Sequence, residues 1–145
     1  MKADNVIINS EDIFILDETI IESLKSLAMK HPLKRSRICL HENIKSSVHE
    51  MIIVAHQDGV IPPHKHPPHK PESYHIIEGE LKVTIFKDDG SIQNEFFLGG
   101  LSQPRMYRII GNIWHQPIPV SEWVVYHEVA TGPFEKDDDV IYLNQ

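Results

Sequence analysis

The chain has 145 residues, a length that fits one globular domain better than two. Its formal net charge of −7 argues against a general nucleic-acid binder, because phosphate contacts need a basic surface. Cys39 is the only cysteine, so no intrachain disulfide can form, and no signal-peptide pattern or membrane-spanning apolar run is visible. We therefore expect a soluble, cytoplasmic protein with neither a nucleic-acid nor a membrane partner.

Residues 17–30 predict one clear helix near the start of the chain. Asp17 is a suitable N-cap, and Pro32 ends the helical pattern. The apolar stripe with helical spacing comprises Ile20, Ile21, Leu24, Leu27 and Ala28. We interpret this stripe as a packing face without a chemical role.

After Pro32 the pattern changes to short apolar runs separated by Gly, Pro and Asp. Strands are predicted over residues 47–56, twice within 73–86, and over 93–98, 106–110 and 122–130. Many short strands behind a single helix indicate an all-β barrel or sandwich. We expect an N-terminal segment with the helix at 1–33 and one barrel at 34–145, with the acidic run at 137–139 solvated.

Histidines are concentrated in the middle of the sequence. Five of the ten histidines fall between residues 56 and 75. Alternate strand residues point to the same face, so His64 and His66 can reach one metal ion together. Flanking prolines stiffen this pair, and a carboxylate, Glu72, follows at the start of the next predicted strand. A solvated histidine-rich loop that binds metal incidentally is the alternative interpretation.

The order Gly59, His64, His66, Glu72 and Gly79 resembles the first motif of the cupin superfamily. The second cupin motif supplies a further histidine from a later strand, and the segment RIIGNIWHQP offers His115 for that role. The resemblance implies a single conical antiparallel β-barrel, or jelly roll. It also implies one divalent metal bound by His64, His66, Glu72 and His115.

A narrower resemblance covers most of the chain. The runs KRSRICLH, IPPHKH, ESYHIIEGEL, FKDDG and EVATGPF are similar to those of WbuC-type cupin metalloproteins. Genes for that group often accompany bacterial O-antigen and surface-polysaccharide genes. The resemblance implies a cytoplasmic setting and a mononuclear metal, but it supplies no reaction.

Three imidazoles and one carboxylate suit Zn, Fe(II), Mn(II), Ni(II) or Co(II). Arg35 and Arg37 share one face if residues 35–41 are extended, and a pair of guanidinium groups can bind an anionic substrate. The alternative for this pair is a solvated sheet edge. His49 and Tyr107 are further candidates for the substrate pocket.

Three functions remain open from the sequence. The first is a metal-dependent enzyme acting on a small sugar-derived or carboxylate-bearing molecule, by isomerisation, epimerisation or hydrolysis. The second is a metal-dependent dioxygenase, and the third is a non-catalytic module that binds a small ligand. We expect a homodimer in each case, because an exposed strand edge favours pairing.

Overall fold

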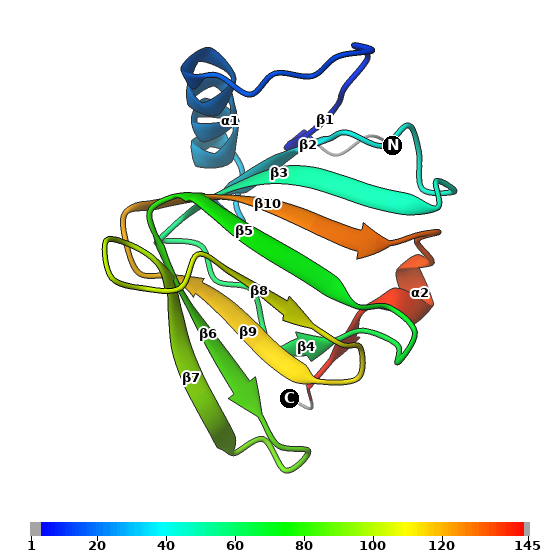
Figure 1. Ribbon diagram of the computed structural model, residues 1–145, viewed down its shortest axis with the longest axis vertical. Helices are drawn as coiled ribbons and strands as arrows, with labels where there is room; N and C mark the ends of the chain where they lie inside the picture. Colours follow the sequence, from blue (N-terminus) through cyan, green and yellow to red (C-terminus); the bar gives the residue numbers. More distant parts are fainter. Residues whose placement is uncertain (1–3, 144–145) are drawn as a thin grey trace.

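Two β-sheets packed face to face make up most of the molecule (Figure 1). The computed structural model describes residues 4–143. The first sheet contains, in spatial order, β1 (Val6–Ile8), β2 (Arg35–Cys39), β3 (Val48–His56), β10 (Trp123–Thr131), β5 (Glu72–Glu78) and β8 (Met106–Ile109). The second contains β11 (Ile141–Tyr142), β4 (His64–Lys65), β9 (Trp114–Pro119), β6 (Glu80–Phe86) and β7 (Ile92–Gly99). Paired strands are antiparallel except β1 and β2, which are parallel.

The main core lies between the two sheets, where alternate residues of each strand point inward. Ile53 of β3 and Tyr126 of β10 face inward from the first sheet, and they pack with Val83 of β6 from the second. These three side chains are at most 2% exposed. The interior between the sheets is therefore closed by apolar packing over much of its length, and polar residues pointing inward must find partners there.

Helix α1 (Glu18–Lys30) covers the outer face of β2 and β3. It begins where predicted, because the side chain of Asp17 accepts a hydrogen bond from the backbone N–H of Ile20 at 2.9 Å. The buried face contains Ile21, Leu24 and Ala28. The buried hydroxyl of Ser36 in β2 donates to the carbonyl of Leu24 at 2.6 Å, which ties the helix to the sheet.

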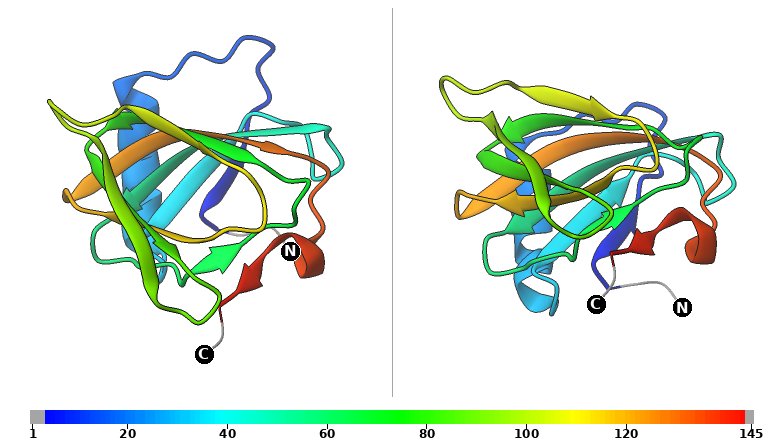
Figure 2. Two further views of the ribbon diagram at one scale, coloured as in Figure 1. Left: turned by 60° about the horizontal axis from the view of Figure 1, so that its bottom comes forward. Right: turned by 90° about the horizontal axis from the view of Figure 1, so that it is seen from below.

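The predicted all-β jelly roll with an N-terminal helix is confirmed. Two features were not predicted: the short strand β1, and a C-terminal return through α2 (Lys136–Asp139) into β11. Figure 2 shows this return lying beside β4. Within residues 4–143, neither helix has the length and apolar character needed to cross a membrane.

Candidate metal centre

The proline-rich loop and two strand starts bring four side chains together. His64 opens β4 and pairs in register with His115 of β9. Glu72 opens β5 in the facing sheet, and His66 lies between them, directly after β4. The backbone N–H of Asn112 donates to the carbonyl of His66 at 2.6 Å, which holds this loop against the β8–β9 connection. Sheet pairing thus unites residues that are about fifty positions apart.

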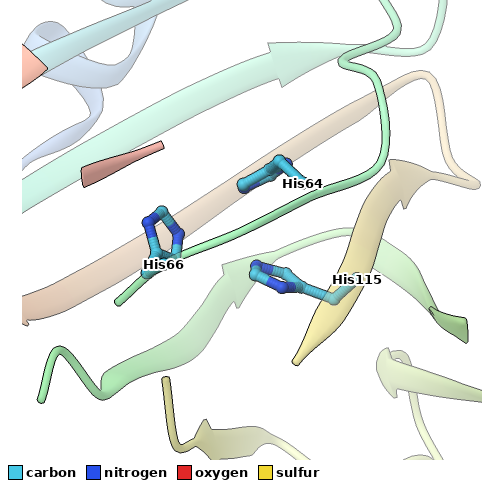
Figure 3. Close-up of side chains that lie close together, drawn as sticks. All are labelled: His64, His66 and His115. Atoms are coloured by element: carbon cyan, nitrogen blue, oxygen red, sulfur yellow. The ribbon is translucent and has the colours of Figure 1, made fainter. Parts of the chain in front are cut away.

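The imidazoles of His64, His66 and His115 turn toward one another (Figure 3). Each contributes a ring nitrogen, and these atoms all lie within 4.8 Å of one another. Two nitrogens bound to one ion at 2.0–2.1 Å are at most about 4.2 Å apart. Ring shifts below about 1 Å would therefore complete a shared coordination sphere, so the triad has the dimensions of a metal site.

The outer nitrogen of each ring is held by a backbone carbonyl. Nδ1 of His64 lies 3.0 Å from the Pro62 oxygen, and Nδ1 of His115 lies 2.9 Å from the Ile113 oxygen. Nδ1 of His66 lies 2.6 Å from an oxygen in α2. A carbonyl can only accept, so each Nδ1 carries the hydrogen and, in a neutral ring, Nε2 keeps its lone pair. This is the arrangement in which histidine binds a metal.

Glu72 lies against two of these inward nitrogens. Its Oε1 is 3.0 Å from Nε2 of His115, and its Oε2 is 3.3 Å from Nε2 of His66. Within the described residues, the buried Nε2 of His66 nevertheless has no hydrogen bond of acceptable direction. A carboxylate oxygen facing a nitrogen lone pair is repulsive unless a proton or a cation lies between them. The donor set therefore fits a divalent cation.

The charges of the ligands follow from the same contacts. Burial disfavours a charged His66, but the neighbouring Glu72 and the α2 carbonyl outweigh it and raise the pKa of His66 to about 9. Burial and the adjacent His115 lower the pKa of His64 to about 4. Although burial opposes ionisation, the His115 and His66 rings hold the pKa of Glu72 well below its usual range. The metal-free centre is thus a carboxylate compensated by a protonated His66.

Exposure shows from which side the centre can be reached. The side chains of Glu72 and His115 are 5% and 1% exposed, whereas that of His66 is 18% exposed. Water or a small ligand therefore approaches past His66. His69 and His75 are both exposed and lie outside the triad.

A second inward carboxylate, Glu128, was missed by the sequence reasoning. It pairs in register with Tyr74 on β5, two residues from the partner of Glu72, and it is 9% exposed. Burial, with the nearby charge of Glu72, raises the pKa of Glu128 to about 7. The only sequence signal was its alternation with Val124 and Tyr126 on one face of the predicted strand.

Tyr107, a predicted pocket residue, lies near the two buried carboxylates, Glu72 and Glu128. It pairs with Tyr74, and the two rings meet edge to face at a centroid separation of 5.1 Å. Among residues 4–143, the Tyr107 hydroxyl is one of the few buried polar atoms without a hydrogen-bond partner. It can therefore donate to a ligand that enters the interior.

Arg35 is not brought to the four candidate ligands. It pairs with Ala55, which pairs with Val124 of β10, whereas Glu72 pairs with Ala130. Val124 and Ala130 are six residues apart along β10, which is roughly 20 Å at about 3.4 Å per residue. The Arg35 guanidinium instead donates to the Tyr126 hydroxyl at 3.0 Å.

The other two predicted pocket residues, Arg37 and His49, differ in depth. Arg37 is exposed on β2, two residues from Arg35. His49 is buried at the level of Glu72, since both pair with Ala130. The rings of His49 and His41 are stacked with their centroids 4.0 Å apart, and Nε2 of His49 lies 3.1 Å from the carbonyl oxygen of Ile44.

Several solved structures have a similar fold. Protein SO0799 from Shewanella oneidensis has a TM-score of 0.61 at 9% identity, covering 77% of this chain and 75% of its own. Oxalate oxidase has a TM-score of 0.56 at 14% identity, covering 78% of this chain and 57% of its own. Oxalate decarboxylase from Bacillus subtilis has a TM-score of 0.57 at 16% identity, covering 75% of this chain and 27% of its own.

At these identities the likeness concerns the fold, and it identifies the jelly roll as that of the cupins. No curated protein matches the sequence. A family model described as a domain of unknown function matches residues 16–98, which is more than half of the chain and includes His64, His66 and Glu72. The chain therefore belongs to this family, DUF6016, and has a cupin fold.

Proposed function

We propose that this protein is a metal-dependent cupin enzyme that binds one divalent transition metal through His64, His66, Glu72 and His115. The observation that carries the proposal is the arrangement of three Nδ1–H groups on backbone carbonyls, which leaves the three Nε2 atoms available to a metal, two of them against the Glu72 carboxylate. Bacillus subtilis oxalate decarboxylase, which has the same fold, contains Mn(II) centres. The donor set of this chain suits manganese, iron, cobalt, nickel or zinc.

The chemistry of such a site divides between the ion and the interior residues. A bound divalent ion would polarise a carbonyl or hydroxyl oxygen of the ligand or lower the pKa of a bound water. Glu128, with its pKa raised to about 7, can hold or release a proton at neutral pH. The Tyr107 hydroxyl, which has no hydrogen-bond partner in the described part of the chain, can orient the ligand by donating a hydrogen bond. Together these groups suit proton transfer, as in isomerisation, epimerisation or hydrolysis.

The substrate class follows from the limited access. Entry past His66 into an interior closed by packing favours a small molecule, and a cation at the centre favours one that bears a carboxylate or vicinal oxygens. The similarity to WbuC-type cupins favours a sugar-derived compound in cytoplasmic surface-polysaccharide metabolism. We also propose a homodimer, since β7 and β8 are edge strands of their sheets.

Elemental analysis of protein purified without a histidine tag tests the metal directly, and His115→Ala tests its ligands. We expect one ion per wild-type chain. At a free zinc concentration 100 times the Kd, binding stabilises the native state by about 2.7 kcal/mol. For a chain of this size, that corresponds to a rise in Tm of about 5–10 °C. His115→Ala should lose most of this rise.

The matched control is His69→Ala, which removes an exposed histidine from the same loop. It should retain both the ion and the rise in Tm. If His115→Ala binds metal as tightly as His69→Ala, the four-residue centre is wrong and the histidine-rich loop binds metal by itself. Bound iron with substrate-dependent oxygen uptake would support a dioxygenase instead. Ligand binding without turnover would support a binding module.

A further inference from the structure

The C-terminal segment packs directly against the candidate metal centre. Ile141 and Tyr142 of β11 pair with Lys65 and His64 of β4 (Figure 2). The backbone N–H of Leu143 also donates to the carbonyl of Pro63 at 3.1 Å. The strand that carries the first candidate ligand thus has this segment as its neighbour on one side and β9 on the other.

Asp139, the last residue of α2, contacts one of the candidate metal ligands directly. Its backbone carbonyl accepts the Nδ1–H of His66 at 2.6 Å. That is the shortest of the three imidazole–carbonyl contacts, and the only one made by a residue distant in sequence. The carbonyls that hold His64 and His115 belong to residues two positions before each ring, so they are supplied by the local backbone. Only His66 depends on a remote segment.

The side chain of Asp139 explains how that carbonyl is held in place. Its Oδ2 accepts hydrogen bonds from Lys70 Nζ at 2.9 Å and from the backbone N–H of Glu135 at 2.7 Å. The Asp139 and Lys70 side chains are 7% and 10% exposed, so water screens their ion pair little. Lys70 also donates to the carbonyl of Pro133. Because Lys70 lies between His66 and Glu72 in sequence, this ion pair joins α2 to the loop that carries both ligands.

We propose that Asp139 is a positioning residue for the metal centre, and that its ion pair with Lys70 couples the C-terminal segment to metal binding. This inference rests on the proposed metal site. The carbonyl of Asp139 fixes the ring of His66 so that Nε2 faces the shared centre. Lys70 neutralises the Asp139 carboxylate and keeps α2 against the loop. Neither residue touches the ion.

The test compares metal affinities of full-length variants. Lys70→Met and Asp139→Asn each break the ion pair at nearly constant volume, and Lys70→Arg keeps it. The control, Lys82→Met, removes the lysine of the Lys82–Glu95 ion pair, which is partly exposed and lies on β6 and β7. Zinc affinity is measured by competition with a chromophoric chelator, and the absorption spectrum of the Co(II) form reports the ligand set.

We expect Lys70→Met and Asp139→Asn to weaken zinc binding about 10- to 100-fold and to change the cobalt spectrum. Lys70→Arg should restore most of the affinity, and Lys82→Met should match the wild type. A purely structural role would lower Tm without changing the cobalt spectrum. Wild-type affinity and spectrum in both disrupted variants would overturn the inference while leaving the proposed metal site intact. Absence of zinc binding by the wild type would instead overturn both.

Amide hydrogen exchange of the wild-type chain tests the same coupling without disturbing the fold. Zinc should slow exchange in residues 137–143, and it should do so much less in His115→Ala, which lacks one proposed ligand but leaves the C-terminal contacts unchanged. Equal exchange with and without zinc in the wild type would contradict the coupling.

Discussion

Glu128→Gln should remove a pH-dependent loss of stability from the metal-free protein. Because the pKa of Glu128 is raised to about 7 from an ordinary value of 4.5, the folded chain holds this proton more tightly than the unfolded chain. The free energy of unfolding therefore falls as the pH rises from 4.5 to 7 and then levels off. A difference of about 2.5 pKa units corresponds to about 3 kcal/mol. Glutamine cannot ionise, so the variant avoids this loss.

The assay is urea unfolding at a series of pH values between 4.5 and 8, in the presence of a chelator. The measured quantity is the difference in unfolding free energy between wild type and Glu128→Gln, because other titrating groups largely cancel in it. This difference should shift by about 3 kcal/mol in favour of the variant across the range. Glu42→Gln, which changes an exposed loop carboxylate, is the control and should show no such trend.

Zinc provides a second check on the same reasoning. A cation bound beside Glu72 cancels the negative charge that helps to raise the pKa of Glu128. In zinc-loaded protein the transition should therefore lie at lower pH. If the wild-type and variant profiles are parallel in metal-free protein, Glu128 is already ionised at pH 5 and its proposed proton-transfer role is wrong.

Two further predictions concern the loop that carries the ligands. Since the pKa of His66 is about 9 in the metal-free centre, zinc must displace its proton. Calorimetry in buffers of different ionisation enthalpy at pH 8 should therefore show release of about one proton, and a His66→Ala variant should release close to none. Gly111→Ala would bring a Cβ atom to 1.8 Å from the carbonyl oxygen of Pro67. It should lower stability by about 1–3 kcal/mol in urea unfolding and also weaken zinc binding, whereas Ile110→Ala at the exposed neighbouring position should do neither.

The elements with strong local signals were predictable from the sequence. Helix α1 begins one residue after Asp17, as its N-cap requires, and ends at Lys30 before Pro32. The long strands follow two-residue alternation. Strands β1, β4 and β11 have two or three residues each, too few for any periodicity, and they exist because a distant partner completes their hydrogen bonds. Their pairing is a property of the tertiary fold.

The candidate ligands also differ in whether a local sequence signal predicts them. His64 and His66 could be paired from local spacing, whereas His115 depended on the order of motifs along a known fold. Asp139 shows the limit of such reasoning, because it ends a run of three aspartates that was expected to be solvated. Asp137 and Asp138 are exposed, but Asp139 is buried against Lys70. Nothing in the run itself distinguishes the third residue from the first two.

Arg35 illustrates why a shared strand face does not establish a shared site. Alternation identifies the face to which a side chain points, but the level along the strand depends on register with distant partners. Arg35 does point inward, yet it pairs with Ala55 at one end of the interior while Glu72 lies at the other. The small cavity beside Arg35 measures about 10 Å³, room for a single water. An anion at the metal centre must therefore be recognised by groups near Glu72. Among the predicted pocket residues, Tyr107 pairs with Tyr74, two residues from Glu72, and its hydroxyl has no hydrogen-bond partner within residues 4–143.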